Sequence, residues 1–287
     1  MTEPLRDPSA RGRAAPAIAR LGPADAAIFE TFVVPRYLSL YGELALEMMA
    51  EGDDAQVVHL HCRTGYPDRG IVTKLRGAYV VGVDASPAAL ALARAKAATM
   101  PEMVSQYRLA DELPTPLPAS AFSHALELHG AADPSERTRV IAECARLLAI
   151  HGQAIIAMPL RGSFQEIADL LREYALKHDD ASLGHAVDQA ALARPTIETL
   201  ASELQEAGFD FVEGLSRPAV LRFSSGRDFF EDPIARLIIV PELSAELELE
   251  DLGPPLSYVR TAIDKYWSDD EFELTVNVGC VTGRREG

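Results

Sequence analysis

Short apolar runs alternate with amphipathic segments in the first half of the chain. One apolar run begins at Val57 and ends in a Thr-Gly pair, and a second covers residues 79–83 and ends at Asp84. A helical segment follows over residues 86–98, where a serine cap precedes a proline at the first helical position. The order strand, turn, helix, strand, helix predicts a nucleotide-binding half-unit, in which the acid after the second strand holds a ribose.

The same alternation continues through the middle of the chain. Helices are predicted to begin at Asp133 and Ser163, because each capping residue has a glutamate three positions later. Gly152 is expected to end the first of these helices in the left-handed conformation. Apolar runs that lie between the helical segments predict strands at residues 104–109, 122–128 and 153–158.

The two ends of the chain carry further predicted elements. Residues 24–49 have a helical apolar pattern, which we expect to break at Pro35. A helix that ends at Gly208 is followed by a strand, and residues 226–266 form an acidic, mainly helical insert. Polar and apolar residues alternate over residues 272–282, which predicts a last, antiparallel strand at or near an edge. Strands that alternate with helices indicate an α/β fold with a doubly wound sheet.

This pattern divides the chain into five parts. A tail without periodicity comes first and is expected to be disordered. Cover helices, an α/β core, an acidic helical insert, and a last strand with the C-terminus follow. The expected parts are residues 1–23, 24–55, 56–225, 226–270 and 271–287.

The charge of the chain limits its partners. The formal net charge is −16, with 48% hydrophobic residues in a chain of 287. Nucleic acids and anionic membranes need clustered Lys and Arg, so this balance argues against both kinds of surface. A small molecule or a protein is the expected partner, and the pattern leaves the oligomeric state open.

The cysteines and the apolar segments bear on the compartment. Cys62, Cys144 and Cys280 are scattered without C-x-x-C spacing, which favours reduced thiols, although a single bridge stays possible. The first residues lack the apolar core of a signal peptide, and no apolar run reaches the roughly 18 residues that span a bilayer. A cytoplasmic protein is therefore expected.

The turn after the first strand carries a resemblance to a known family. Its sequence HLHCRTG resembles the motif D-x-G-x-G-x-G, often DLGCGTG, of class I S-adenosylmethionine-dependent methyltransferases of the small-molecule type. Thr64 and Gly65 match the motif, as does the cysteine before them. His59 replaces the acid, and His61 and Arg63 replace two glycines. The motif is therefore degenerate at the positions that approach the cofactor.

Two later segments strengthen the resemblance. The run Asp111-Glu112-Leu113-Pro114 is similar to the family's D-A-E-x-L-P, whose acid commonly reaches the adenine amine; a solvated acidic turn is the alternative. The segment from Glu143 to Pro159 is similar to E-x-x-R-V-L-x-P-G-G-x-x-x-I-x-x-P, with His151 at the first glycine. The resemblance implies a mostly parallel, seven-stranded Rossmann-like sheet of order 3-2-1-4-5-7-6 with strand 7 reversed.

The resemblance also implies a cofactor site and a reaction centre. S-adenosylmethionine is the implied cofactor if binding is retained, and otherwise none is expected. Glu127 and His129 follow the fourth strand, where reactants bind in doubly wound sheets, and are the candidate catalytic base. A loop hydrogen bond or a cap is the alternative role for these two. The candidate cofactor-binding residues are His59, His61, Arg63, Thr64, Gly65, Asp84, Asp111 and Glu112.

A metal site is a more distant hypothesis. His59 and His61 are two residues apart on a strand, with Cys62 beside them and His129 after the neighbouring strand. No compact four-ligand spacing exists, so hydrogen-bonded side chains are the preferred interpretation and no metal is predicted.

Two functions follow from the substitutions in the motif. The preferred hypothesis is a methyltransferase-fold protein with weakened or lost S-adenosylmethionine binding, which acts as a non-catalytic binding or regulatory protein. The alternative is an active methyltransferase for a small nucleophile, in which Arg63 swings outward. Arginine at the middle glycine opposes the cationic sulfonium by both volume and charge, which favours the first hypothesis.

Overall fold

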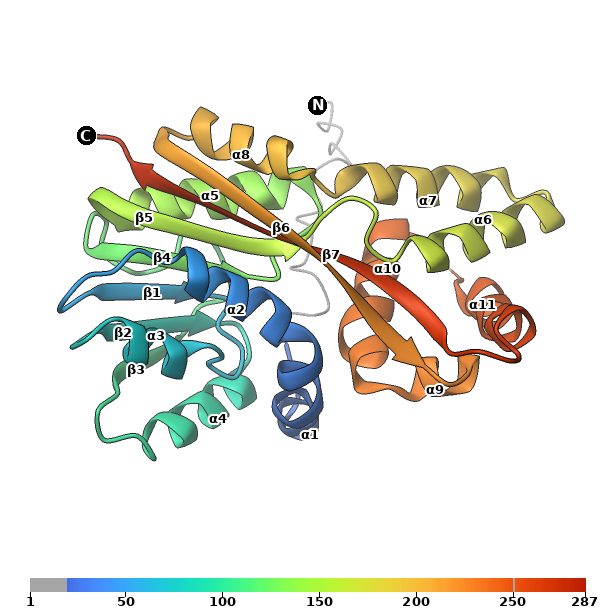
Figure 1. The fold of residues 1–287 in the computed structure, drawn as a ribbon, viewed down its shortest axis with the longest axis horizontal. Helices are drawn as coiled ribbons and strands as arrows, with labels where there is room; N and C mark the ends of the chain where they lie inside the picture. Colours follow the sequence, from blue (N-terminus) through green and yellow to red (C-terminus); the bar gives the residue numbers. More distant parts are fainter. Residues whose placement is uncertain (1–19, 250) are drawn as a thin grey trace, which may run out of the picture.

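In residues 20–249 and 251–287, which the structure describes, seven strands form one sheet of order β3-β2-β1-β4-β5-β7-β6 (Figure 1). The structure is a computed structural model. β1 to β5 are parallel, whereas β7 is antiparallel to both β5 and β6. The predicted doubly wound sheet and its strand order are confirmed. The strands are β1 (Gln56–Leu60), β2 (Tyr79–Asp84), β3 (Val104–Leu109), β4 (Phe122–Leu128), β5 (Leu148–Pro159), β6 (Phe209–Phe223) and β7 (Phe272–Arg285).

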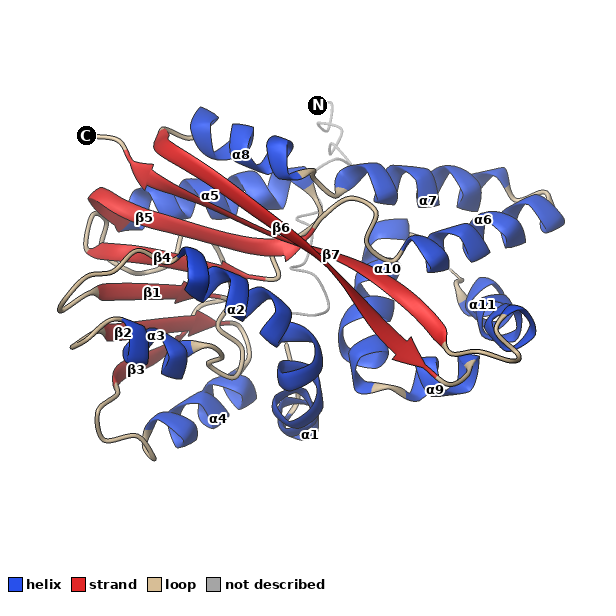
Figure 2. Cartoon of the chain, in the orientation of Figure 1, coloured by secondary structure: helices blue, strands red, loops and turns tan. Residues whose placement is uncertain are grey.

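Helices cover both faces of the sheet (Figure 2). Alternate residues of the strands point to two hydrophobic cores, one with α2 and α3 and one with α5 and α8. No helix in the described part of the chain is long and apolar enough to cross a bilayer. The helices are α1 (Pro23–Ile28), η2 (Phe29–Leu38), α2 (Ser39–Met48), α3 (Asp68–Lys74), α4 (Pro87–Ala97), α5 (Pro134–Leu147), α6 (Gln165–His178), α7 (Ala181–Ala193), α8 (Ile197–Glu206), α9 (Gly226–Glu231), η3 (Ala235–Ile239), α10 (Val240–Leu247) and α11 (Gly253–Tyr266).

The N-terminal cover is one continuous helical segment from α1 to α2. The predicted break at Pro35 is wrong, because the chain passes this residue in the π-helix η2. A π-helical turn is wider than an α-helical turn, so a residue without an N–H group fits inside it. The cover buries Phe29, Tyr37 and Tyr41 completely. Most of the predicted tail, residues 1–19, lies outside the described residues.

Two predicted helix boundaries need correction. α5 ends at Leu147 and β5 begins at the next residue, so Gly152 lies inside the strand. The left-handed residue is His151, with a φ of 63°. Glycine follows it because a Cβ at Gly152 would lie 2.9 Å from the carbonyl oxygen of Ala149. Close backbone approach, and not a helix cap, therefore explains this glycine.

The predicted capping box at Ser163 is also wrong. α6 begins at Gln165 without a side-chain cap. The hydroxyl of Ser163 instead accepts the N–H of Asn277 at 2.9 Å, and the Glu166 carboxylate accepts the N–H of Thr275 at 3.1 Å. Both side chains thus attach α6 to β7, which competes with the local cap. The helix α7, which Asp180 caps, was not predicted.

β6 and β7 extend past the rest of the sheet. β5 pairs with β7 only from Val278 onward, whereas residues 272–277 pair with β6 alone. This two-stranded extension carries α9, η3, α10 and α11 between its strands, and they form a second lobe with α6 and α7 (Figure 1). The acidic insert is therefore attached to the sheet by a β-ribbon. One of its helices, α10, lies close to α7.

Candidate functional site

The turn after β1 keeps a glycine-like backbone. His61 has a φ of 45° and Arg63 a φ of 47°, and Gly65 follows with a φ of 76°. The two substituted positions thus adopt the left-handed conformation, which costs a side-chain-bearing residue about 1 kcal/mol or more. A Cβ at Gly65 would lie 3.1 Å from both the Cβ of Ala93 and the hydroxyl of Tyr107, so this glycine also permits close packing.

His59 replaces the family's acid but lies beside one. Its Nδ1 is 2.6 Å from Oδ1 of Asp68, and both side chains are buried. The hydroxyl of Tyr107 donates to the other oxygen of Asp68 at 2.7 Å. Burial, followed by the Asp68 charge, raises the pKa of Tyr107. A carboxylate therefore lies next to position 59, but it comes from the start of α3.

His61 and Glu127 form a pair at the carboxyl ends of β1 and β4. Nδ1 of His61 lies 2.9 Å and 3.0 Å from the two oxygens of Glu127. The negative charge of Glu127 raises the pKa of His61, against an opposing effect of burial. Glu127 is buried and is engaged by this histidine.

Arg63 extends from the turn toward β4. Its Cζ lies 5.7 Å from the ring centroid of Phe29, and Nη1 donates to the carbonyl oxygen of Leu128 at 3.4 Å. Its backbone N–H donates to Asp84 at 2.9 Å, and the second oxygen of Asp84 accepts the N–H of Ser86 at 2.8 Å. The predicted ribose-binding acid is thus buried and bonded to two backbone groups.

The N-terminal segment lies over the ends of β2 and β3. Arg20 forms an ion pair with Asp111 at 3.2 Å, and the hydroxyl of Ser86 donates to the carbonyl oxygen of Leu21 at 2.7 Å. Asp111 keeps 59% of its side-chain surface exposed, and Glu112 is also exposed. The acids predicted to reach ribose and adenine are therefore covered, in part, by the chain itself.

The backbone of Thr64 links the turn to α4. Its hydroxyl is buried without a hydrogen-bond partner, and its carbonyl oxygen accepts Nζ of Lys96 at 3.0 Å. Lys96 also forms an ion pair with Glu30 at 2.6 Å. The turn is thereby tied to α4 and to the N-terminal cover.

His129 belongs to a different cluster from Glu127. The hydroxyl of Tyr37 lies 2.7 Å from its Nε2, and the hydroxyl of Tyr41 donates to Tyr37 at 3.0 Å. Burial, followed by the charges of Arg63 and Arg194, lowers the pKa of His129 well below its usual range. The imidazole is therefore neutral at neutral pH, and its Nε2 is held by a hydrogen bond with the Tyr37 hydroxyl.

The insert contributes two acids to this cluster, which sequence reasoning missed. Oε1 of Glu242 lies 3.3 Å from Nδ1 of His129 but at a geometry that makes no hydrogen bond. Nη2 of Arg194 lies 2.9 Å from Oε1 of Glu246 and 3.7 Å from Oε2 of Glu242. Cζ of Arg194 lies 5.2 Å from the ring centroid of Phe164. Only the acidity of the insert hinted at these residues.

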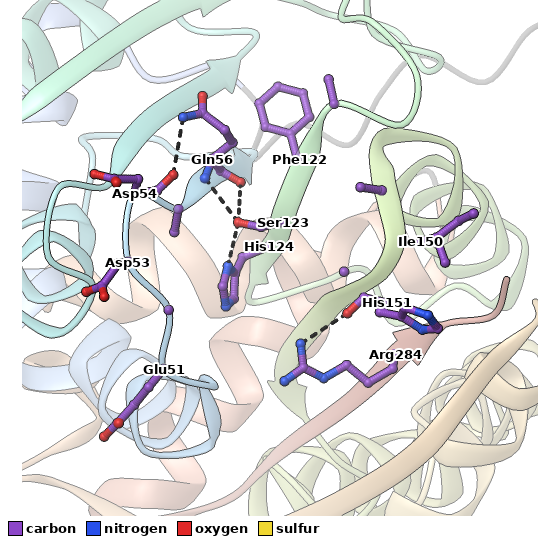
Figure 3. A pocket seen from close by; sticks show the side chains of 15 residues that line it. Glu51, Asp53, Asp54, Gln56, Phe122, Ser123, His124, Ile150, His151 and Arg284 are labelled. Carbon is purple, nitrogen blue, oxygen red and sulfur yellow. Dashed lines mark hydrogen bonds between the residues drawn. The ribbon is translucent and has the colours of Figure 1, made fainter.

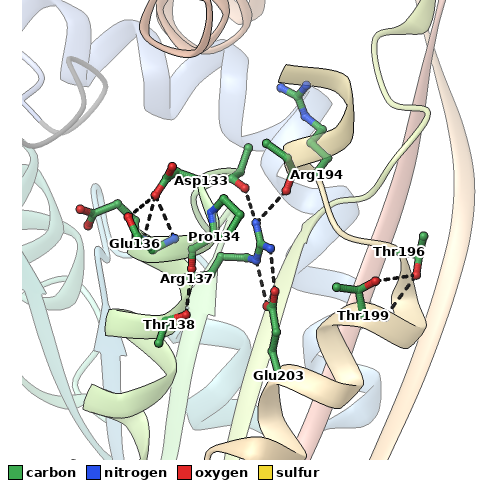
Figure 4. A network of polar contacts seen from close by, with 12 residues as sticks. Asp133, Pro134, Glu136, Arg137, Thr138, Arg194, Thr196, Thr199 and Glu203 are labelled. Carbon is green, nitrogen blue, oxygen red and sulfur yellow. Dashed lines mark hydrogen bonds and ion pairs between the residues drawn. The ribbon is translucent and has the colours of Figure 1, made fainter. Parts of the chain in front are cut away.

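A buried arginine holds the segment that carries Arg194 (Figure 4). Arg137 on α5 bonds both oxygens of Glu203 on α8, at 2.9 Å and 2.7 Å. Its Nη1 also donates to the carbonyl oxygens of Ala132 and Ala193. The end of α7, directly before Arg194, is thus fixed to α5 and α8.

The hypothetical metal site is not assembled. His59 contacts Asp68, His61 contacts Glu127, and His129 contacts Tyr37. In the part of the chain that the structure describes, no three His, Cys, Asp or Glu side chains are grouped to hold a metal ion. His61 lies beyond the end of β1, so the assumed one-face geometry is wrong.

A hollow lies at the other end of the strands, away from the turn after β1 (Figure 3). It has a volume of about 380 Å³ and adjoins the amino ends of β1, β4 and β5. Glu51, Asp53 and Asp54 face His151 and Arg284 across it. It contains none of the predicted site residues. A second cavity beside Glu127 has only about 10 Å³, which is room for about one water molecule.

Comparisons with known proteins agree with this fold. Residues 59–156 match the family model described as a methyltransferase domain. A proposed methyltransferase of Bacillus halodurans C-125 has 16% identity and a TM-score of 0.56, over 86% of this chain and 99% of that chain. The YcgJ protein of Bacillus subtilis has 12% identity and a TM-score of 0.54, over 86% and 98%.

A third solved structure is a methyltransferase with its cofactor. Phosphoethanolamine N-methyltransferase 2 of Haemonchus contortus, in complex with S-adenosyl-L-methionine, has 13% identity and a TM-score of 0.54. The match covers 93% of this chain and 58% of that chain. No curated protein sequence matches significantly. At these identities the solved structures establish the fold, and activity has to be argued from the site.

Proposed function

We propose that this chain, whose residues 59–156 match a methyltransferase domain model, is a methyltransferase-fold protein with weakened or lost S-adenosylmethionine binding. It acts as a binding or regulatory protein, without catalysis. Its partner is a small molecule or another protein, and the acidic insert offers a contact surface. The proposal concerns the cofactor cleft, because the rest of the sheet follows the family's order.

The position of Arg63 carries this proposal. Its guanidinium lies between the ring of Phe29 and the carbonyl oxygen of Leu128, above the carboxyl ends of β1 and β4. Reactants of doubly wound sheets bind at these strand ends. The side chain therefore fills space that the family leaves open by placing glycine at this position.

Charge opposes the cofactor in the same place. S-adenosylmethionine carries a sulfonium cation, whereas this turn presents Arg63 and a histidine, His61, whose pKa Glu127 raises. Two like charges about 4 Å apart repel by about 4 kcal/mol at an effective dielectric constant of about 20, which weakens binding about a thousandfold. These residues do not fit a cationic ligand at this point.

The nucleoside end supports the same proposal less strongly. Asp84 and Asp111 are retained, but their carboxylates are engaged by Ser86, by the backbone of Arg63 and by Arg20. An adenosine-like ligand has to displace the segment that contains Arg20 before it reaches them. Nucleoside binding without methyl transfer therefore remains compatible with this end of the cleft.

Calorimetry with S-adenosylmethionine and with S-adenosylhomocysteine tests the proposal. We expect no saturable binding to the unmodified chain at millimolar ligand. The double variant His61→Gly and Arg63→Gly should gain micromolar binding, because glycine removes both the bulk and the charge and suits the left-handed backbone.

His151→Gly is the matched control. It removes the side chain of another left-handed histidine, with a φ of 63°, that lies outside the cleft. It should therefore leave cofactor binding unchanged. Micromolar binding to the unmodified chain would refute the proposal. Failure of the double variant to bind would show that more than these two side chains blocks the cleft.

An active methyltransferase is the second candidate, favoured by the cluster at His129. A neutral, buried imidazole lies beside the end of β4, where its unpartnered Nδ1 is able to hydrogen-bond a methyl acceptor while Tyr37 fixes its ring. Formation of S-adenosylhomocysteine by the unmodified chain, lost in His129→Gln, would select this candidate.

A further inference from the structure

Four polar atoms remain without hydrogen-bond partners where α10 meets the end of β4. They belong to side chains from three segments, and each atom is buried. Leaving a buried polar atom unpaired is unfavourable, so such a group normally has a partner. The atoms are Nδ1 of His129, Nε of Arg194, Oε2 of Glu242 and Oε2 of Glu246.

One guanidinium faces two carboxylates in this cluster. Glu242 and Glu246 are four residues apart on α10, and both lie near the guanidinium of Arg194. Arg63 has no described ion pair with either acid. Burial raises the pKa of Glu242 to about 8 and also raises the pKa of Glu246. One of the two acids therefore keeps its proton where a cation would otherwise balance it.

We propose that Glu242 and Glu246 bind the protonated amine of a small organic molecule. An ammonium group has three N–H donors and no acceptor, so it satisfies both free carboxylate oxygens at once. A metal ion fits less well, because no group of three suitable ligands exists in the described residues. Each glutamate side chain keeps about a tenth of its surface exposed, 11% and 12%, so the pair lies close to solvent.

This amine site is separate from the turn after β1. Its acids lie on the insert, and its occupation does not require S-adenosylmethionine to bind. In a non-catalytic protein the amine is simply the ligand. If methyl transfer occurs, the amine nitrogen is bound next to His129, which lies 3.3 Å from Glu242. Cofactor titrations and amine titrations therefore fail or succeed independently.

Calorimetry with methylammonium chloride at pH 9 tests the site, with potassium chloride as the control for ionic strength. We expect saturable one-site binding in the millimolar range for methylammonium alone. At pH 7 the affinity should be about tenfold weaker for each pH unit below 8, because Glu242 has to release its proton. The heat at pH 7 should then vary with the ionisation enthalpy of the buffer.

The titratable and charged groups that face Glu242 come from every element packed around it. They are His129 after β4, Arg194 after α7, Glu246 on α10, Arg63 after β1, Tyr37 on η2 and Tyr41 on α2.

Variants separate the site from general charge effects. Glu242→Gln with Glu246→Gln should abolish methylammonium binding, whereas Glu206→Gln, an exposed acid on α8, should preserve it. If the double variant fails to fold, Glu246→Gln alone should weaken binding at least tenfold. The proposal is overturned if the unmodified chain shows no saturable heat, if potassium gives the same heat, or if the glutamine variants bind equally well.

Discussion

Two histidines at the ends of neighbouring strands have pKa values shifted in opposite directions. His61 follows β1 and His129 follows β4, and both are left-handed, with φ values of 45° and 59°. Each lies beside a glutamate, at 2.9 Å for Glu127 and 3.3 Å for Glu242. Yet the pKa of His61 is raised, whereas that of His129 is lowered well below its usual range.

Solvent and neighbouring cations explain the difference. The side chain of His61 is 41% exposed and hydrogen-bonds to both oxygens of its glutamate, so the charge of Glu127 dominates. The side chain of His129 is 1% exposed, and Arg63 and Arg194 add to the cost of charging it. A nearby carboxylate therefore does not decide the protonation of a histidine; burial and the remaining charges do.

Among substitutions around these two histidines, Tyr37→Phe should have the largest effect on stability. The change leaves Nε2 of His129 and the hydroxyl of Tyr41 without their partner, inside a fully buried cluster. We expect a loss of about 3 kcal/mol in the free energy of unfolding, measured by urea denaturation. Tyr41→Phe is the matched control and should cost less, because Tyr37 keeps its bond to His129. Equal losses would contradict the proposed order of hydrogen bonds.

A smaller effect is expected from Glu127→Gln, which removes the charge beside His61. Since the folded pKa of His61 is raised, the pair stabilises the fold fully below the unfolded pKa near 6.5, and this contribution disappears as pH rises through the folded pKa. The variant should lose only about 1 kcal/mol in the free energy of unfolding at pH 6, because solvent screens the exposed imidazole. The loss should be smaller at pH 9, where the contribution of the charged pair is reduced. Urea denaturation at both pH values measures the difference.

Glu112→Gln provides the control for that experiment. Glu112 is an exposed acid at the end of β3 and was predicted for the same cofactor site. Its replacement should leave stability unchanged at both pH values. A loss that is as large at pH 9 as at pH 6 in Glu127→Gln would show that packing, and not the charge of His61, produces it.

Local sequence signals predicted most of the sheet. The bounds of β3 and β4 agree with their apolar runs, and Ser86 and Asp133 cap α4 and α5 as expected. These signals depend on neighbouring residues only. The errors occur where tertiary contacts compete with local preference, as at Ser163, which bonds to Asn277 of β7.

The site was only partly predictable for the same reason. The predicted fourth strand placed Glu127 at its carboxyl end, beside the end of β1. The roles of all the predicted site residues stay predictions. Arg194 and Glu242 were missed because their partners are distant in sequence and no motif marks them. Asp68 is close in sequence to His59, but no motif marks it either. Only the fold brings α10 to His129.

Arg63→Met should produce the smallest effect and the sharpest test of the comparison. Methionine keeps an apolar chain near Phe29 but removes the charge that lowers the pKa of both histidines. NMR titration of the imidazole protons should show both pKa values rising by a fraction of a unit. Burial remains the largest influence on His129, so its pKa stays below its usual range and below that of His61. Arg69→Met, at an exposed position on α3, should change neither pKa. If the two pKa values converge in Arg63→Met, then the arginine, and not burial, is what separates the two histidines.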